Sequence, residues 1–170
     1  MGTQLTIAAA AAAAQLEALS PMVPNNKQTL IALAKKIAAN FKLAPELVCA
    51  LIEQESGWNC WSMRYEPEFF AKYVSSLYTN NQISATEAYA RGMSWGLCQV
   101  MGEVARENGF DMRFLSALCD PETGISMGCT ILAKKLEREG GDVVKGLLAY
   151  NGGGNKQYAV QVLARQDKYR

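Results

Sequence analysis

The sequence predicts a mainly α-helical protein. Apolar residues recur at helical spacing in successive segments, residues that cap or open helices stand before these segments, and glycines follow several of them. No segment shows the strict alternation and the hairpin turns that are typical of strands. With 170 residues, of which 49% are hydrophobic and 19% are charged, the chain is long enough to bury a core. We therefore expect one globular domain over residues 25–170.

Residues 1–24 form a segment of different composition. An unbroken alanine run from Ala8 to Ala14 favours a helix, but alanine is too weakly apolar for a convincing membrane span. No lysine or arginine precedes the run and no strongly apolar stretch follows it, so the pattern of an export signal is weak. We expect a peripheral helix here, with an export signal as the alternative, and a break at Pro21 and Pro24.

The first helices of the domain follow from apolar spacing and from proline. Apolar residues at helical spacing, with lysines on the opposite side, predict an amphipathic helix over residues 26–41. Pro45 is placed to open the next helix and Gly57 to close it. A further helix is expected over residues 67–78.

Capping residues predict where the later helices begin. Ser84 and Glu87 have the form of a capping box, in which each side chain bonds to the backbone of the other. Asp120 and Asp142 each stand where an N-cap is needed, and pairs or runs of glycine end the helices that follow. Helices are accordingly expected over residues 84–91, 121–139 and 143–151, and from about residue 156 onward.

Glu55 has the most informative position in the chain. The helix opened by Pro45 carries an apolar face that includes Leu47 and Leu51, and Glu55 continues this face at its C-terminal end. A carboxyl group in that position is half desolvated, which disfavours its charged form and raises its pKa. A raised pKa is what a general acid needs near neutral pH. The alternative is a structural carboxylate that is bonded to the backbone or paired with a lysine.

The composition excludes several kinds of chemistry. The chain contains no histidine, which rules out the usual Ser-His-Asp and Cys-His catalysis and histidine metal sites. The formal net charge is +1 and no basic tract occurs, so we expect no nucleic-acid partner. The side chains that remain for acid–base catalysis are carboxylates, lysines, tyrosines and cysteines. Because histidine is missing, the composition favours carboxylate chemistry.

The five cysteines show no spacing typical of a metal site. Cys49, Cys98 and Cys129 lie in helical patterns and are expected to act as small core residues. Cys60 and Cys119 lie near expected loops, where a disulfide could form but is not predicted.

Segments on both sides of the chain's centre carry a resemblance to a known family. In chain order they read E-S-G-W-N from Glu55, G-L-C-Q-V-M from Gly96 and A-Y-N-G-G from Ala149. In this order they resemble the signature segments of the lytic transglycosylases and goose-type lysozymes. The resemblance covers about residues 47–154 and implies a lysozyme-like α-helical domain with a substrate cleft. It also implies cleavage of the glycan strands of bacterial peptidoglycan.

The resemblance assigns roles to particular residues. It carries the catalytic acid of the family onto Glu55, in agreement with the position of this residue on its helix. Gln99 and Met101 match positions that line the sugar-binding cleft. Tyr150 and Asn151 match a tyrosine–asparagine pair whose hydroxyl group lies close to the catalytic carboxyl. The residues expected to bind the substrate are Ser94, Gln99, Met101, Tyr150 and Asn151, with Glu66 as a further candidate.

Glu66 is the candidate for a second carboxylate. It lies in the segment Arg64-Tyr65-Glu66-Pro67, which resembles more loosely a segment of some phage-encoded cell-wall lysins. Glu66 could instead pair with Arg64 or begin the next helix, where the helix dipole favours an acid. The choice affects the reaction. In the family that the chain resembles, a single acid is associated with 1,6-anhydro products. A second carboxylate that positions water would lead to hydrolysis instead.

The resemblance thus predicts a peptidoglycan lytic transglycosylase that cleaves between N-acetylmuramic acid and N-acetylglucosamine, with Glu55 as acid and base. The alternatives are a hydrolytic lysozyme of the phage endolysin type that uses Glu66, a chitin-directed glycosidase, and an inactive wall-binding or virion structural protein. No metal or organic cofactor is implied. We expect a monomer that acts on glycan strands in the periplasm or cell wall, without stable membrane insertion, in a bacterial or a phage setting.

Overall fold

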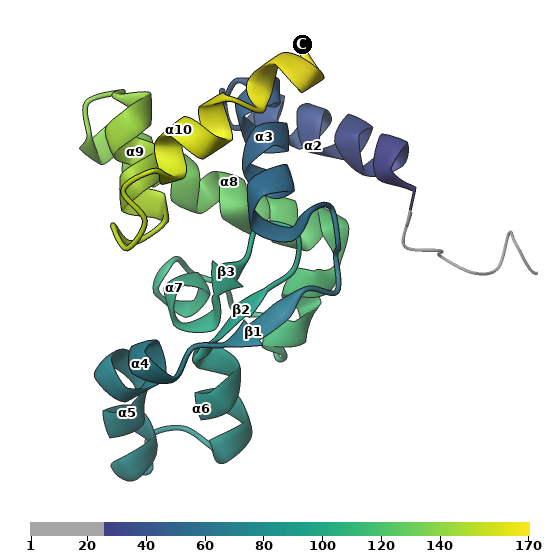
Figure 1. Ribbon diagram of the computed structural model, residues 1–170. Coiled ribbons are helices and arrows are strands. Elements are labelled where there is room, and N and C mark those ends of the chain that lie inside the picture. The colour runs from purple at the N-terminus through teal and green to yellow at the C-terminus, as the bar shows by residue number, and fades with distance from the viewer. Residues whose placement is uncertain (1–25) are drawn as a thin grey trace, which may run out of the picture.

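Helices make up most of the structure, a computed structural model that describes residues 26–170 (Figure 1). The mainly α fold predicted from the sequence is therefore confirmed, and the segment expected over residues 1–24 lies outside the described residues. The α-helices are α2 (Lys27–Asn40), α3 (Pro45–Ser56), α4 (Pro67–Phe69), α5 (Ser75–Thr79), α6 (Ala85–Arg91), α7 (Gly102–Glu107), α8 (Pro121–Arg138), α9 (Val143–Tyr150) and α10 (Tyr158–Leu163). A π-helical turn, η1 (Phe70–Val74), and two 3₁₀ turns, η2 (Leu115–Cys119) and η3 (Gln166–Tyr169), complete the helical elements.

The predicted capping residues begin the helices, but the capping box at Ser84 is only half formed, because the Glu87 carboxylate accepts from Arg91 and Arg106 instead. Ser84 accepts a hydrogen bond from the backbone N–H of Glu87 at 3.2 Å at the start of α6. Asp120 does the same for Thr123 at 2.9 Å in α8, and Asp142 opens α9. These side chains satisfy backbone donors that have no partner inside the helix, which is why such residues fix a helix start.

The helix predicted over residues 67–78 is helical throughout but not uniform. It consists of α4, the π-helical turn η1 and α5 in succession. A π-helical turn holds one extra residue per hydrogen-bonded ring and is most often found at functional positions. The final helix predicted from about residue 156 corresponds to α10 and η3.

A small antiparallel sheet, which the sequence pattern did not reveal, lies below the helical body. Its strands are β1 (Met63–Tyr65), β2 (Met93–Trp95) and β3 (Val100–Met101), in the order β1-β2-β3. Arg64 is paired with Ser94, and Ser94 in turn with Met101. The strands are too short to show an alternating pattern, and a mainly α fold accommodates them.

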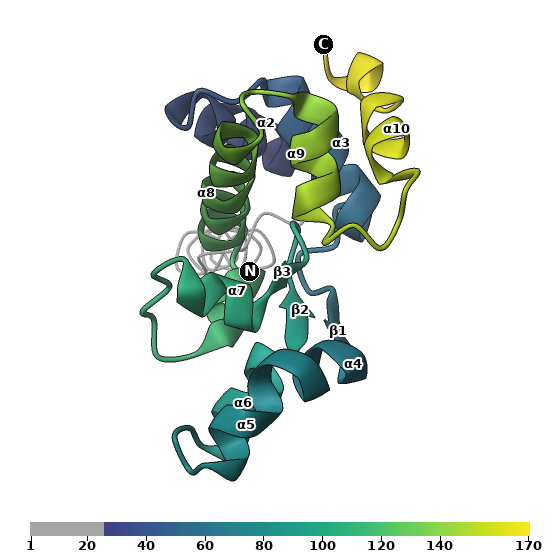
Figure 2. The ribbon, with the colours of Figure 1, turned by 90° about the vertical axis from the view of Figure 1, so that its left-hand side faces the viewer.

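The connection from β1 to β2 is a helical lobe rather than a tight turn. We call residues 66–92 the lower lobe; it contains α4, η1, α5 and α6 and stands below the sheet, away from the main body (Figures 1 and 2). Helix α7 lies beside the sheet, in contact with β2, β3 and α6, and the helices α2, α3, α8, α9 and α10 pack together above it. The sheet therefore lies between the two parts.

The core of the main body is built around α3. Every residue from Leu47 to Ile52 is buried, and α3 packs against α2, α10 and η3. Burying a large apolar side chain stabilises a fold by roughly 1.5–3 kcal/mol. This helix is therefore held rigidly, and the direction in which Glu55 leaves its last turn is fixed by the core.

The C-terminal segment is joined to the end of α3 by hydrogen bonds and an ion pair. The Trp58 indole N–H donates to the hydroxyl of Tyr169 at 2.9 Å, and that hydroxyl donates to Glu53 at 2.7 Å. Lys168 pairs with the same Glu53 carboxylate at 2.9 Å. Burial and the neighbouring Glu53 carboxylate raise the pKa of Tyr169 to about 12, so its hydroxyl remains a donor. These contacts fasten the residues on both sides of Glu55 without involving it.

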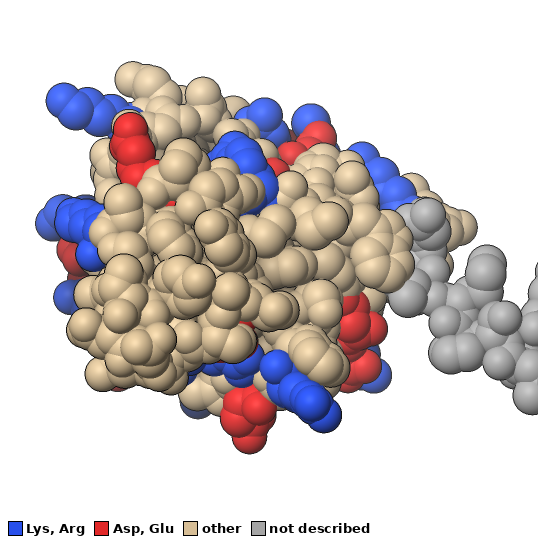
Figure 3. Space-filling view, turned by 90° about the horizontal axis from the view of Figure 1, so that it is seen from below, with Lys and Arg blue, Asp and Glu red and all other residues tan. Residues whose placement is uncertain are grey.

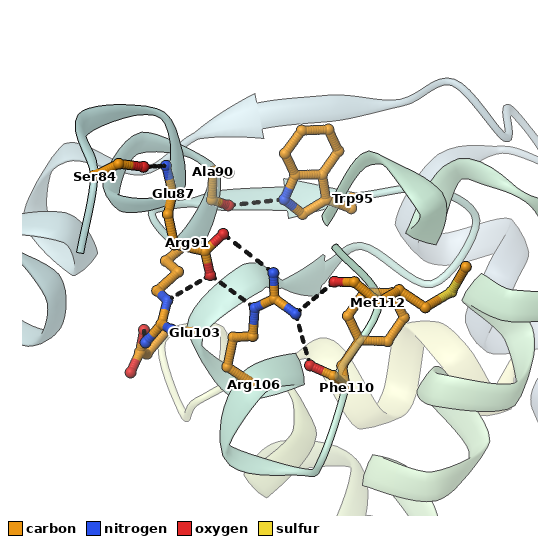
Figure 4. A network of polar contacts seen from close by, with 9 residues as sticks. All are labelled: Ser84, Glu87, Ala90, Arg91, Trp95, Glu103, Arg106, Phe110 and Met112. Atoms are coloured by element: carbon orange, nitrogen blue, oxygen red, sulfur yellow. Dashed lines mark hydrogen bonds and ion pairs between the residues drawn. The ribbon is translucent and has the colours of Figure 1, made fainter. Parts of the chain in front are cut away.

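A network of charged side chains joins the lower lobe to α7 (Figure 4). The Glu87 carboxylate accepts from Arg91 at 2.8 Å and from Arg106 at 2.7 Å. Burial alone would raise the pKa of Glu87, but these two guanidinium groups outweigh it and hold the pKa below its usual value. Arg106 also donates to the backbone oxygens of Phe110 and Met112. The network thus fixes α6 relative to α7.

All five cysteines are buried and none forms a disulfide. The core positions expected for Cys49, Cys98 and Cys129 are confirmed. Cys98, however, lies in the turn between β2 and β3 and not in a helix.

Candidate active site

A cavity of about 680 Å³ lies where α3, the sheet, the lower lobe and α9 meet. We call it the central cavity. All the site residues predicted from the sequence line it, and these are Glu55, Glu66, Ser94, Gln99, Met101, Tyr150 and Asn151. Segments that are far apart in the sequence are therefore brought to one place by the fold.

Glu55 projects from the last turn of α3 and is partly buried. The hydroxyl of Tyr158, at the start of α10, donates a hydrogen bond to its Oε1 atom. Burial raises the pKa of Glu55, and the Tyr158 hydrogen bond and the charge of Arg64 offset only part of this rise. The half-desolvated carboxyl group predicted from the helical pattern is thus present. It can hold a proton at a higher pH than an ordinary glutamate.

Two tyrosines surround this carboxyl group, and they have different partners. The Tyr150 hydroxyl donates to the backbone oxygen of Cys98 at 2.9 Å and not to Glu55. Burial raises the pKa of Tyr150 and of Tyr158 well above the usual value, and the nearby Glu55 charge adds to the rise in both. Both hydroxyl groups therefore stay protonated. The direct hydrogen-bond partner of Glu55 is Tyr158.

Sequence reasoning did not identify Tyr158. The residue opens a short helix near the C-terminus, outside the segments that carry the family resemblance. Its side chain is only 2% exposed, and nothing in the local pattern distinguishes it from a core aromatic. The only signal was its place four residues before Val162 in a helical pattern, which predicts burial but no contact.

Glu66 lines the central cavity and is also paired. Its Oε1 atom lies 2.5 Å from Nε of Arg64, and its side chain is 30% exposed. Its backbone N–H donates to the carbonyl of Gly92 at 2.9 Å, and the residue occupies the N-cap position of α4. The structure therefore combines the interpretations of Glu66 that the sequence left open: cavity carboxylate, ion-pair partner and helix start.

The polar groups of Gln99 are used within the protein. Its Nε2 atom donates to the backbone oxygens of Ser62 at 3.0 Å and Gly96 at 2.9 Å. Its Oε1 atom accepts from the hydroxyl of Ser94 at 2.9 Å. Gln99 and Ser94 thus tie β1 to the turn between β2 and β3 and so shape one wall of the central cavity. Met101 lines the cavity at the end of β3.

Gly96 is required by this turn. It has a φ of +66°, and a Cβ atom there would lie 2.2 Å from the backbone oxygen of Leu118. Only glycine avoids both the strained backbone conformation and the clash. Gly96 is the first residue of the G-L-C-Q-V-M segment, and this geometry shows why a glycine stands there.

Asn151 ends α9 and shapes the glycine-rich loop that follows. Its Oδ1 atom accepts from the backbone N–H of Asn155 at 3.0 Å. Gly152 and Gly153, with φ angles of +75° and +79°, then turn the chain back toward α10. The loop therefore brings Tyr158 to Glu55.

The described residues offer no obvious metal site. Within residues 26–170, no group of three or more carboxylate, cysteine or histidine side chains is arranged to hold a metal ion. None of the helices in this part of the chain is long and apolar enough to cross a membrane.

The fold is a helical domain, and its central cavity is lined by carboxyl groups that include the partly buried Glu55. The family model described as the transglycosylase SLT domain matches residues 32–169, and the chain belongs to this family. Members of this family are peptidoglycan lytic transglycosylases, so the protein is an enzyme that acts on peptidoglycan. A comparison with solved structures gave no match.

Proposed function

We propose that Glu55 is the catalytic acid and base for cleavage of the β-1,4 bond between N-acetylmuramic acid and N-acetylglucosamine. The observation that carries this proposal is the raised pKa of Glu55 in the central cavity, beside the Tyr158 donor. Burial keeps a proton on the carboxyl group before the reaction. The tyrosine holds the group in one orientation and stabilises the carboxylate that forms when the proton leaves.

The reaction begins when Glu55 protonates the glycosidic oxygen and the bond to the muramoyl C1 breaks. The muramoyl ring passes through an oxocarbenium-like transition state, and the N-acetylglucosamine side leaves as an alcohol. The Glu55 carboxylate then removes the proton from the C6 hydroxyl of the same ring. The C6 oxygen bonds to C1, which gives a 1,6-anhydro ring without water. Glu55 ends the cycle protonated.

Glu66 carries the second candidate, hydrolysis. It lines the same cavity as Glu55 and is paired with Arg64. A carboxylate in this position could orient a water molecule that attacks C1 in place of the C6 hydroxyl. The product would then carry a reducing muramic acid end.

Product analysis separates the two reactions. Purified peptidoglycan is digested with the wild-type protein and with Glu66→Gln, and the soluble muropeptides are analysed by mass spectrometry. The proposal predicts 1,6-anhydromuramoyl ends from both proteins. Reducing ends from the wild type that disappear in Glu66→Gln would establish the hydrolytic alternative.

We also propose that the protein acts at the bacterial cell wall or in the periplasm, because its substrate class lies there. A monomer would suffice, because one chain supplies every residue named in the central cavity.

A further inference from the structure

The tyrosines of this protein fall into two groups. Tyr150, Tyr158 and Tyr169 have hydrogen-bonded hydroxyl groups in the main body. Those that are markedly exposed lie in the lower lobe or in the strand that leads to it, and they are Tyr65, Tyr73, Tyr78 and Tyr89. Seen from below, where the lower lobe is nearest to the viewer, uncharged residues cover most of the visible face (Figure 3). Exposing large aromatic side chains to water is unfavourable, so several of them on one surface point to a binding surface.

One pair of these aromatic residues faces the central cavity. Phe69 and Tyr73 both line it, together with Glu55 and Glu66. Their ring centroids are 4.7 Å apart with an interplanar angle of 46°, and Tyr73 is 48% exposed. The side chains thus form a tilted aromatic surface on the lobe side of the cavity, while Glu55 approaches from α3.

A second group of aromatic rings packs together in the same part of the molecule. Phe70 stacks on Tyr89 with centroids 5.3 Å apart and an angle of 12°, and Tyr65 contacts both rings. Gly92 is needed for this packing, because a Cβ atom there would lie 2.9 Å from the Phe70 ring. The packing holds η1, and the π-helical turn sets the direction of Tyr73. The lobe itself is fixed to α7 by the Glu87 network (Figure 4).

We propose that Phe69 and Tyr73 form an aromatic platform on which a sugar ring of the glycan strand packs, on the side of the cavity away from α3. This proposal rests on the proposed function and extends the substrate contacts beyond the bond that is cleaved. The C–H face of a pyranose ring is apolar and flat, which suits an aromatic surface. Glu68 lines the same cavity, and Nζ of Lys72 lies over the Tyr73 ring, 4.9 Å from its centroid. These charged groups can serve as partners for sugar hydroxyls.

The consequence is a preference for long strands. We expect a strand that runs from Glu55 across the aromatic platform to gain the stacking contact, and a tetrasaccharide of two disaccharide repeats, bound around the cleaved bond, to lack it. The platform would therefore lower KM for long strands and leave kcat largely unchanged, because it binds the ground state and the transition state alike.

The test compares Tyr73→Ala with Tyr78→Ala on two soluble substrates, uncrosslinked glycan strands and the tetrasaccharide. Tyr78 is a matched control because it lies in the same lobe, is 41% exposed and does not line the central cavity. We expect kcat/KM on long strands to fall about five- to ten-fold in Tyr73→Ala, mainly through KM, as for the loss of one aromatic contact. Tyr73→Phe, which keeps the ring, should restore it, and cleavage of the tetrasaccharide should not change.

A binding measurement tests the aromatic platform independently of catalytic turnover. Titration calorimetry of long strands into Glu55→Gln, with and without Tyr73→Ala, should show the same loss of affinity. Equal behaviour of Tyr73→Ala and Tyr78→Ala on long strands, or an equal loss on the tetrasaccharide, would overturn the platform. A failure of the proposed function would be seen separately, as a wild-type protein that cleaves neither substrate.

Discussion

Removing the Tyr158 hydroxyl should slow the reaction and change its pH dependence. In Tyr158→Phe the carboxylate formed on Glu55 loses its hydrogen-bond donor, while the buried ring remains to fill the core. A hydrogen bond to a charged group contributes about 1.5–3 kcal/mol, more than the bond to the neutral acid. If about 1.5 kcal/mol of this is lost only after proton transfer, kcat falls roughly ten-fold.

The pH profile gives the second readout of this substitution. Glu55 must be protonated, so the rate falls as the pH rises through its pKa. The Tyr158 hydrogen bond lowers this pKa, and its removal should move the alkaline limb of the profile to higher pH. Initial rates on purified peptidoglycan, measured from about pH 4 to about pH 9, would show both effects.

Tyr150→Phe is the matched control, because its hydroxyl donates to Cys98 and its loss should leave the alkaline limb in place. The reasoning would be refuted if Tyr158→Phe kept the plateau rate and the alkaline limb of the wild type.

Three further substitutions test the fold around the site. Gly96→Ala forces a Cβ atom to 2.2 Å from the Leu118 oxygen at a φ of +66°. It should lower the free energy of unfolding by about 2–4 kcal/mol in denaturant titration, and a loss under about 1 kcal/mol would contradict the geometry. Arg106→Ala leaves the Glu87 carboxylate and two backbone oxygens without this donor, and a loss of about 3 kcal/mol is expected from the same measurement. Glu55 has a raised pKa, so the folded protein binds more protons than the unfolded chain between the ordinary and the raised pKa. Unfolding free energy should therefore fall as the pH rises through this window, and Glu55→Gln, which cannot titrate, should gain stability over the wild type toward high pH. A constant difference between the two proteins at all pH values would argue against burial of the acid.

The helices could be predicted from the sequence because their signals are local. A helix start is set by groups within one turn, as at Pro45, Ser84 and Asp120. The same holds for the position of Glu55, since a helical face depends only on spacing. The sheet could not be predicted, because strands of two or three residues are defined by partners distant in the chain.

The site residues were found more easily than their contacts. Gln99 was expected to face the substrate, but its amide is engaged in holding the turn between β2 and β3. Tyr150 was expected beside the carboxyl group, whereas Tyr158 makes the direct contact. Sequence patterns identify which residues come to a site, and only packing decides which atoms meet there.

The measurement that tests the role of Glu55 most directly compares Glu55→Gln with the wild type in turnover and in binding. The wild type should solubilise purified peptidoglycan, and Glu55→Gln should lose at least about a hundred-fold in rate, as expected for the removal of a general acid. It should still bind glycan strands with an affinity close to that of the wild type, because the rest of the central cavity is unchanged. Near-normal turnover by a folded Glu55→Gln protein would contradict the assignment of Glu55 as the acid.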